Sequence, residues 1–219
     1  VLWWWSRHQA QAKLISIGSS CSYPAGSLLR EENYLRGEPV DSLYAYAMTK
    51  RMLHVGLGAL HRQFGLRYLT LVPATLFGPD YPLDGRQKHF IFDLIDKIWR
   101  GRREGAAVVL WGDGAQKREL VSREDFVTAA VALADTQENA LINIGSGKER
   151  SIRWYARRIC ERVGYPFKKV SFDRSRYVGV RSKRLAVGKL KRLLPSFKPA
   201  EIEDALDVTV DWWEKACLR

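Results

Sequence analysis

Two short apolar runs, separated by one long amphipathic segment, restrict the possible folds more than any other feature of the sequence. The first run, 13–17, is rich in β-branched residues and ends at a polar Gly-Ser-Ser turn, and the second, 67–72, ends at Pro73. Between them, apolar residues recur at helical spacing from Tyr44 to about Phe64, and Gly65 is placed to end the helix. A strand, a helix and a second strand in this order form a βαβ unit, which predicts a parallel sheet.

The rest of the chain continues the alternation of helix and strand. Helices are expected at about 89–100, 123–134, 152–163 and 199–217, and strands at 107–110 and 141–144. Ser151 is placed as the N-cap of the helix that begins at Ile152. The expected fold class is therefore α/β.

Composition excludes several classes of protein. Hydrophobic residues make up 46% of the chain and charged residues 27%, as in globular proteins. No apolar run approaches the roughly 20 residues of a membrane-spanning helix, and the opening Val-Leu-Trp-Trp-Trp is too short for a signal peptide core. The 3 cysteines lack CxxC spacing, which predicts neither a disulfide framework nor a zinc site. We expect a cytoplasmic protein with reduced thiols, no metal and no membrane partner.

Tyr46 and Lys50 carry the first indication of chemistry. Four residues apart on the expected helix, their side chains share one face. A neighbouring ammonium stabilises a phenolate, which a phenol that exchanges protons requires. Groups at the carboxyl ends of parallel strands and at the following helix share one crevice, so Ser19 is expected at the same site.

Three further segments carry short motifs. Residues 18–24 read Gly-Ser-Ser-Cys-Ser-Tyr-Pro, residues 73–79 read Pro-Ala-Thr-Leu-Phe-Gly-Pro, and residues 111–119 read Trp-Gly-Asp-Gly-Ala-Gln-Lys-Arg-Glu. Together with Tyr46 and Lys50, these segments resemble the extended short-chain dehydrogenases/reductases, the NAD-dependent epimerase/dehydratase family. Within that family they are most similar to the GDP-L-fucose synthase branch.

The resemblance implies the C-terminal part of a Rossmann-like parallel sheet, with a smaller α/β substrate-binding domain. Residues 1–80 and 120–146 are expected to form the partial Rossmann-like domain. Residues 81–119 and 147–219 are expected to form the domain that binds a nucleotide-sugar. Family members often dimerise through the helix that bears Tyr46, so a homodimer is expected for the full-length enzyme.

The resemblance also implies an activity and its residues. The expected reaction is the 3,5-epimerisation and 4-reduction of GDP-4-keto-6-deoxymannose with NADP, NAD being the alternative cofactor. The catalytic residues implied are Ser19, Cys21, Tyr46, Lys50 and His89. Contacts to the cofactor are implied for Tyr46, Lys50, Pro73, Thr75 and Leu76. Contacts to the nucleotide-diphosphate sugar are implied for Lys97, Trp111, Arg118 and Lys183.

The sequence departs from the family pattern at several places. Thr75 stands where the family has Asn, and Ala186 stands where an Asp is expected. Family members carry about 100 further residues before the Ser-Ser-Cys strand, including a Gly-x-x-Gly-x-x-Gly turn that holds the cofactor pyrophosphate, and no such motif occurs here. We therefore expect a truncated or frame-disrupted chain that neither binds NADP tightly nor turns over. A half completed by a partner chain is the alternative.

Two other functions remain open from the sequence. Another 4-epimerase or 4,6-dehydratase of the same superfamily would keep the fold, but dehydratases typically place a Glu and an acidic partner near the Ser position, and Ser19, Ser20 and Cys21 offer neither. A non-catalytic nucleic-acid-binding protein would explain the net charge of +12 and the basic cluster of residues 181–192. No helix-turn-helix, zinc-finger or RNP signature accompanies that cluster, so a nucleic-acid partner is not favoured.

Overall fold

The computed structural model describes residues 1–26, 28–85, 87–176 and 179–217. Its helices are α1 (Leu2–His8), α2 (Tyr44–Phe64), α3 (Phe90–Glu104), α4 (Arg123–Thr136), α5 (Ile152–Val163), α6 (Gly188–Leu193) and α7 (Ile202–Cys217). Its strands are β1 (Leu14–Ile17), β2 (Leu28–Leu29), β3 (Tyr68–Pro73), β4 (Thr75–Phe77), β5 (Val108–Trp111), β6 (Lys117–Ser122), β7 (Ala140–Ile144), β8 (Glu149–Ser151), β9 (Val170–Asp173) and β10 (Arg184–Leu185). Short 3₁₀ turns η1 (Ser20–Ser22), η2 (Glu31–Asn33), η3 (Asp41–Leu43) and η4 (Phe167–Lys169) connect them.

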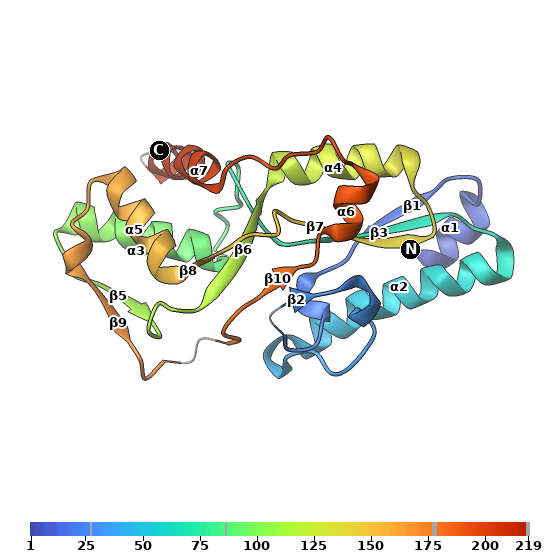
Figure 1. Cartoon of the computed structure of the whole chain (residues 1–219), viewed down its shortest axis with the longest axis horizontal. Coiled ribbons are helices and arrows are strands. Elements are labelled where there is room, and N and C mark those ends of the chain that lie inside the picture. The colour runs from blue at the N-terminus through green and yellow to red at the C-terminus, as the bar shows by residue number, and fades with distance from the viewer. Residues whose placement is uncertain (27, 86, 177–178, 218–219) are drawn as a thin grey trace.

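A parallel sheet in the order β1-β3-β7 forms the first half of the fold. Ile15 pairs with Leu69, and Leu71 pairs with Ile142, so the sheet is parallel throughout. Helices α2 and α4 lie on opposite sides of this sheet (Figure 1). The βαβ unit predicted from the sequence is therefore confirmed, and the central strand β3 is buried along its whole length because helices cover both of its faces.

The ends of the helices follow from local sequence chemistry. Gly65 ends α2 in the left-handed region at φ 68°, a conformation that glycine adopts at low cost. Ser122 and Ser151 begin α4 and α5, where their hydroxyl oxygens accept hydrogen bonds from the backbone N–H of Asp125 at 3.0 Å and of Trp154 at 3.1 Å. The N-cap that the sequence predicted at Ser151 is thus confirmed.

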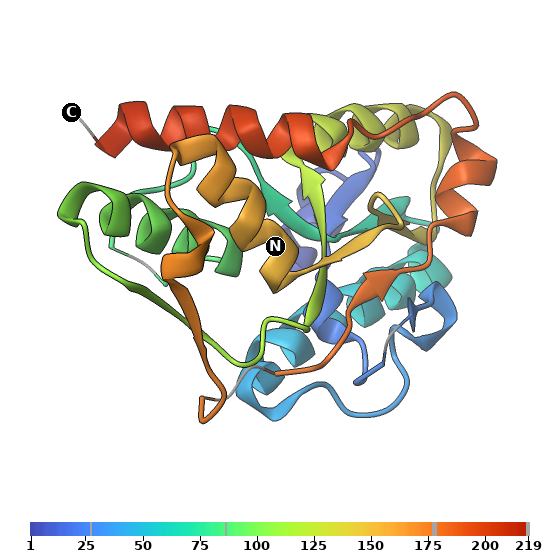
Figure 2. The same ribbon diagram turned by 60° about the vertical axis from the view of Figure 1, so that its left-hand side comes forward.

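The second half of the fold is a three-helix layer beside a two-stranded sheet. Helices α3, α5 and α7 share one apolar core, which includes the fully buried Phe92, Ile159 and Trp213. Helix α7 runs along the upper edge of this layer (Figure 2). Paired Arg–Asp side chains also join α5 to α7, with Arg158 Nη2 at 2.7 Å from Asp207 Oδ2. Strands β5 and β9 are parallel and lie at the outer side of this half.

Strand β6 connects the two halves and positions the site. It pairs with β4 in parallel and with β8 in the antiparallel direction, and it leads directly into α4. The short strand β10 pairs with β2, so the segment that precedes α6 returns to the turn region after β1. Both connections bring residues from distant parts of the sequence to the carboxyl end of the first sheet (Figure 1).

Several elements differ from the sequence-based expectations. The opening residues, for which no element was predicted, form helix α1, in which Trp5 is buried against α2 and its indole Nε1 donates to Ala12 O at 3.0 Å. The last helix begins at Ile202 instead of Pro199. Strands β2, β4, β6, β8, β9 and β10 were not predicted. Among the described residues, no helix combines the length and the apolar character that crossing a membrane requires.

Candidate active site

The turn after β1 holds the predicted Ser-Ser-Cys motif. Ser19 is buried and caps η1, where its Oγ accepts a hydrogen bond from the backbone N–H of Cys21 at 3.1 Å. Gly18 precedes the turn, and a Cβ at that position would lie 2.9 Å from the hydroxyl of Tyr34 and from Val72 Cγ2. A glycine is therefore required for β1 to approach β3 this closely.

The start of α2 places Tyr46 and Lys50 beside the same turn. Lys50 Nζ donates to the backbone carbonyl of Ile17, the last residue of β1, at 2.9 Å. The same ammonium lies 5.8 Å from the centre of the Tyr46 ring, and half of the Tyr46 surface is exposed. The predicted pairing of this phenol and ammonium at the carboxyl end of β1 is thus present in the structure.

Arg51, which sequence analysis did not select, joins α2 to the Ser-Ser-Cys turn. Its buried guanidinium donates from Nε to the carbonyl of Ser22 at 2.7 Å and from Nη1 to that of Gly37 at 2.7 Å. Ser22 Oγ in turn donates to Ala47 O at 3.2 Å. These bonds fix η1, which bears Cys21, against the first turns of α2, which bear Tyr46.

Cys21 opens into a cavity of about 170 Å³ that also receives Arg118 from β6 and Lys183 from the segment before β10. Lys183 Nζ lies 3.3 Å from Cys21 Sγ. Arg118 Nη1 donates to Lys117 O and to Val180 O, at 2.8 Å each. A smaller adjoining cavity is lined by Arg118 and Lys183 together with Thr75 of β4. Two cations and no carboxylate line the larger cavity, as far as the chain is described, and this arrangement suits an anionic ligand.

Glu119 lies directly behind this cavity and was also missed by sequence analysis. It is 3% exposed, and its two carboxylate oxygens accept hydrogen bonds from the backbone N–H of Gly147 and of Leu185, both at 2.6 Å. Burial raises the pKa of Glu119 to about 7 despite these donors. The carboxylate therefore fastens β6 to β10 and to the turn after β7.

His89 lies at the N-cap position of α3, on the other half of the fold. Its backbone N–H donates to the Tyr81 hydroxyl at 3.1 Å, and its ring centre lies 5.8 Å from that of Tyr81. Burial lowers the pKa of the His89 imidazole, which favours the neutral ring. The described residues that line the Cys21 cavity include neither His89 nor Tyr46, so joint action of these three residues stays a prediction.

Lys97 and Trp111 form a separate group on the second half of the fold. Lys97 Nζ pairs with Asp93 Oδ2 at 2.7 Å and lies 5.4 Å from the Trp111 ring centre. More than half of the Trp111 surface is exposed. The two side chains together present a flat ring beside a cation, but the described lining of the Cys21 cavity does not include them.

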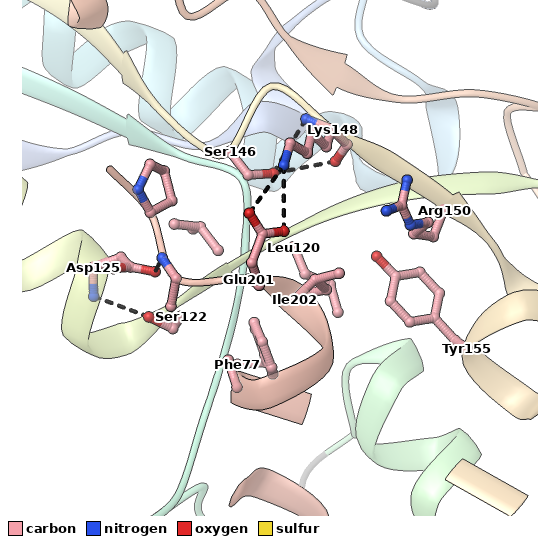
Figure 3. A pocket seen from close by; sticks show the side chains of 14 residues that line it. Phe77, Leu120, Ser122, Asp125, Ser146, Lys148, Arg150, Tyr155, Glu201 and Ile202 are labelled. Atoms are coloured by element: carbon pink, nitrogen blue, oxygen red, sulfur yellow. Dashed lines mark hydrogen bonds and ion pairs between the residues drawn. The ribbon is translucent and has the colours of Figure 1, made fainter. Parts of the chain in front are cut away.

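A further cavity, of about 50 Å³, lies where the start of α7 meets α4 and β8 (Figure 3). Lys148 and Glu201 form an ion pair at this cavity, with Nζ and Oε2 3.3 Å apart. None of the residues predicted for catalysis or binding lines it. We therefore place the candidate active site at the Cys21 cavity, which is larger and holds three of the predicted residues.

The remaining predicted residues, Pro73, Thr75 and Leu76, lie at the end of β3 and in β4. Pro73 ends β3 in the buried sheet, and Leu76 is half-buried in β4, where it packs against two apolar clusters. Cofactor contacts for these residues and for Thr75 stay predictions. No group of three or more potential metal ligands occurs among the residues that the structure describes.

A parallel α/β sheet with Tyr46 and Lys50 at the carboxyl end of its first strand places the chain among the short-chain dehydrogenase/reductase folds. Comparison with known sequences is more specific, because residues 1–145 match the NAD dependent epimerase/dehydratase family. The chain belongs to this enzyme family, and both the resemblance and the fold class predicted from the sequence are confirmed.

Among the relatives and solved structures that the chain resembles are several GDP-L-fucose synthases. The chain is 30% identical to the GDP-L-fucose synthase of Escherichia coli over 217 residues, which cover 92% of this chain and 66% of that protein. It is 34% identical to the GDP-L-fucose synthase of Sinorhizobium fredii over 185 residues, 81% of this chain and 58% of that protein. It superposes on the GDP-L-fucose synthetase of Naegleria fowleri bound to NADP with a TM-score of 0.83 and 28% identity, covering 94% of this chain and 64% of that one. The chain thus spans less than two thirds of the length of these relatives.

Proposed function

We propose that this chain carries the catalytic and substrate-binding residues of an NADP-dependent nucleotide-sugar epimerase/reductase of the GDP-L-fucose synthase type. The observation that supports this proposal is the meeting of the Ser-Ser-Cys turn, the Tyr46–Lys50 pair and the cationic cavity at the end of β1. The proposed substrate is GDP-4-keto-6-deoxymannose. The proposed reaction is 3,5-epimerisation followed by reduction at C4.

The Tyr46–Lys50 pair fits one part of NADP. Lys50 is anchored on β1, and the half-exposed Tyr46 lies beside it, so both side chains can reach a nicotinamide ribose at this strand end. NADPH supplies a hydride when bound. Tyr46 donates its phenolic proton to the C4 oxygen as negative charge develops there, and the Lys50 ammonium stabilises the resulting phenolate.

Ser19 and the cavity side chains have complementary tasks. The Ser19 oxygen already accepts a bond from Cys21 N–H, so its hydroxyl hydrogen remains to be donated to the C4 oxygen. Arg118 and Lys183 balance the charge of the diphosphate. Cys21 and His89 exchange protons at the carbons beside the ketone: each C–H bond breaks as the electron pair moves into the carbonyl, and a proton is returned from the opposite face.

Replacement of Tyr46 by Phe tests this proposal. The assay uses a chimaera in which residues 13–219 follow the cofactor-binding segment of the Escherichia coli relative, because this supplies the Gly-rich turn that the sequence lacks. Tyr46→Phe is expected to lower NADPH oxidation by about 10² to 10⁴, the usual effect of removing a general acid, while affinity for the GDP-sugar changes only a few-fold.

Tyr44→Phe is the matched control, since Tyr44 is an exposed tyrosine on the same turn of α2. This variant is expected to keep the rate of the unmodified chimaera. Reduction of the ketone at an unchanged rate by Tyr46→Phe would contradict the proposed role of the phenol.

A further inference from the structure

We propose that His54 is a positioning residue for the reduction step, because it fixes the register of α2 against β1 and β3 and so holds Lys50 and Tyr46 at the carboxyl end of β1. The consequence for catalysis rests on the proposed function, since it requires that Tyr46 and Lys50 act on the ketone. The register of the helix is a property of the chain alone, so it can be tested without the cofactor or the sugar.

A chain of three polar side chains lies between α2 and the first sheet. His54 Nδ1 is hydrogen-bonded to Thr70 Oγ1 on β3 at 2.9 Å, and Thr70 Oγ1 is hydrogen-bonded to Ser16 Oγ on β1 at 3.0 Å. Ser16 and Thr70 are partners in the register of the sheet, and both are buried. Because a hydroxyl group both donates and accepts, the chain of bonds is complete with the proton at either end. One side chain of α2 is thereby bonded to β3 directly and to β1 through Thr70.

The three side chains form a closed ring of contacts with Lys50. Lys50 precedes His54 by one turn of α2, and Ser16 directly precedes Ile17, whose carbonyl accepts the hydrogen bond from Lys50 Nζ at 2.9 Å. Two adjacent turns of the helix are therefore bonded to two adjacent residues of β1. A helix held at two such points cannot slide or rotate on the sheet without breaking a bond, whereas one bond alone leaves rotation about that point open.

Apolar packing does not fix this part of α2. The apolar cluster beneath the helix contains the fully buried Leu57, which lies toward the C-terminal end, and the buried residues of α2 before Leu57 are Ala47 and Arg51. Hydrophobic contact is non-directional, whereas a hydrogen bond weakens steeply when its atoms are misaligned. The register of the turns that bear Lys50 therefore depends on polar bonds, and His54 supplies the one from this helix to β3.

Two tyrosine rings hold the imidazole of His54 in place. Its ring centre lies 5.7 Å from that of Tyr34 and 5.9 Å from that of Tyr68, and both pairs meet edge to face. Burial, with a smaller contribution from the charge of Lys189, lowers the pKa of this imidazole, so the neutral ring is favoured. The described lining of the Cys21 cavity does not include His54, which therefore acts on the reaction through Lys50.

Three substitutions separate the hydrogen bond from the bulk of the side chain. The amide of Asn lies at the same number of bonds from Cα as Nδ1 of His, so His54→Asn keeps a partner for Thr70, whereas His54→Leu fills the space without a polar atom. Ser16 and Thr70 stay bonded to each other in His54→Leu, so this variant is expected to fold. Thr70→Val breaks the same bond from the side of β3 and gives an independent measurement. His61→Leu is the matched control, because Nδ1 of His61 donates to Leu66 O at 3.0 Å near the far end of the same helix.

The first experiment follows Lys50 in the 219-residue chain. Acetylation by N-hydroxysuccinimidyl acetate is measured at each lysine by mass spectrometry, and the rate at Lys50 is divided by the rate at the exposed Lys148 of the same sample. We expect this ratio to rise several-fold in His54→Leu and in Thr70→Val, because the Lys50 ammonium is held on β1 for less of the time. The ratio should keep its parent value in His54→Asn and in His61→Leu. An unchanged ratio in His54→Leu and Thr70→Val would overturn the inference.

The second experiment compares two steps of the reaction in the chimaera. Entry of solvent deuterium beside the ketone reports on Cys21 and His89, and NADPH oxidation reports on Tyr46 and Lys50. The ratio of these two rates does not depend on the folded fraction of the protein. In a variant that lacks the His54 bond, we expect kcat for NADPH oxidation to fall about tenfold, which is less than the roughly 10²-fold cost of a 1 Å misplacement. Deuterium entry and KM for the GDP-sugar should keep their parent values.

The outcomes distinguish the inference from the proposed function. Recovery of NADPH oxidation in His54→Asn is expected. A parallel fall of both rates in His54→Leu would show a merely structural residue, and an unchanged kcat would show that the register does not matter for reduction, so either result would overturn the inference. A raised acetylation ratio at Lys50 together with a parent chimaera that reduces no ketone would count against the proposed function alone.

Discussion

At the scale of single residues, Glu119 shows how a charged side chain can be structural at the edge of a site. Successive side chains of a strand point to opposite faces of the sheet, so the strand position of Glu119 between Arg118 and Leu120 does not by itself give its carboxylate a partner. Here its carboxylate binds two backbone N–H groups from distant segments. The nearby cation that favours its charged form is Arg184.

The raised pKa of Glu119 predicts a specific pH dependence of stability. The group binds a proton more readily in the folded than in the unfolded chain, so its neutral form contributes stability below about pH 4.5 that is lost as the pH rises through about 7. The full effect is roughly 3 kcal/mol, because each unit of difference between the pKa values of the folded and the unfolded chain is worth about 1.4 kcal/mol.

Urea unfolding of the parent and of Glu119→Gln at pH 5 and pH 8 isolates this contribution. His54 and His89, whose pKa values are lowered by burial, shift stability in the opposite direction in both proteins, and their effect cancels in the difference. The parent is expected to lose stability relative to Glu119→Gln between pH 5 and pH 8. An equal pH dependence in the two proteins would show that Glu119 stays charged.

Several site residues were predictable because short motifs carry them. Cys21 and Arg118 each lie in a motif that the sequence presents, Lys183 lies in the basic cluster of residues 181–192, and the structure brings these three together. The structural roles of Arg51 and of Glu119, the last residue of the 111–119 motif, were not predictable, since their partners are main-chain groups that no side-chain pattern identifies. The contact between Lys183 and Cys21 was likewise not predictable, because it forms only when β10 pairs with β2.

At the scale of elements, long periodic segments were predicted and short strands were not. Helices α2 and α5 follow clear apolar spacing and capping residues, and β3 is a continuous apolar run. Strand β6 begins Lys-Arg-Glu, and β10 has only 2 residues, so neither shows a usable alternation. Neighbouring strands supply their hydrogen-bonding partners, since β6 lies between β4 and β8, and β10 pairs with β2.

Two helical glycines are expected to respond in opposite ways to alanine. In an exposed helix, alanine in place of glycine stabilises by about 1 kcal/mol. Gly58 of α2 allows this, because the nearest atom to an added Cβ is the mobile end of Arg62 at 3.4 Å. Gly101 of α3 does not, because its Cβ would overlap Val108 Cγ2 in the packed core.

Thermal and urea unfolding of Gly58→Ala and Gly101→Ala check this contrast. Gly58→Ala is expected to raise the free energy of unfolding by about 0.5 to 1 kcal/mol, and Gly101→Ala to lower it by about 1 to 3 kcal/mol through overpacking. Val108→Ala removes the methyl group that the new Cβ would overlap. The free energy of unfolding is therefore expected to be higher in the double variant Gly101→Ala/Val108→Ala than in Val108→Ala alone. Stabilisation by Gly101→Ala would contradict the close approach of α3 and β5.

At the scale of the whole molecule, the first sheet has an open edge. The described residues place β3 beside β1 and no strand on its other side. Ile15 and Ile17 on this strand are 43% and 39% exposed, and Trp3 and Trp4 on α1 are exposed as well. An unpaired apolar strand offers free backbone groups to another chain.

We expect the 219-residue polypeptide to associate through this edge as its concentration rises. Ile15→Lys and Ile17→Lys should each lower light scattering several-fold, because a charge on an edge strand opposes pairing. Val131→Lys is the control, since Val131 is an exposed valine on α4 and the change in net charge is the same. Equal suppression by all three variants would assign the effect to net charge instead of the edge.

The pairing of Cys21 with Lys183 joins residues that lie 162 positions apart in the sequence. At the usual rate of about 5 to 20 residues per second, a ribosome needs on the order of ten seconds or more to add that length of chain. Throughout that interval the newly made Cys21 lacks its contact with Lys183. The cavity into which Cys21 opens is therefore completed only after Arg118 and the segment that bears Lys183 have been made.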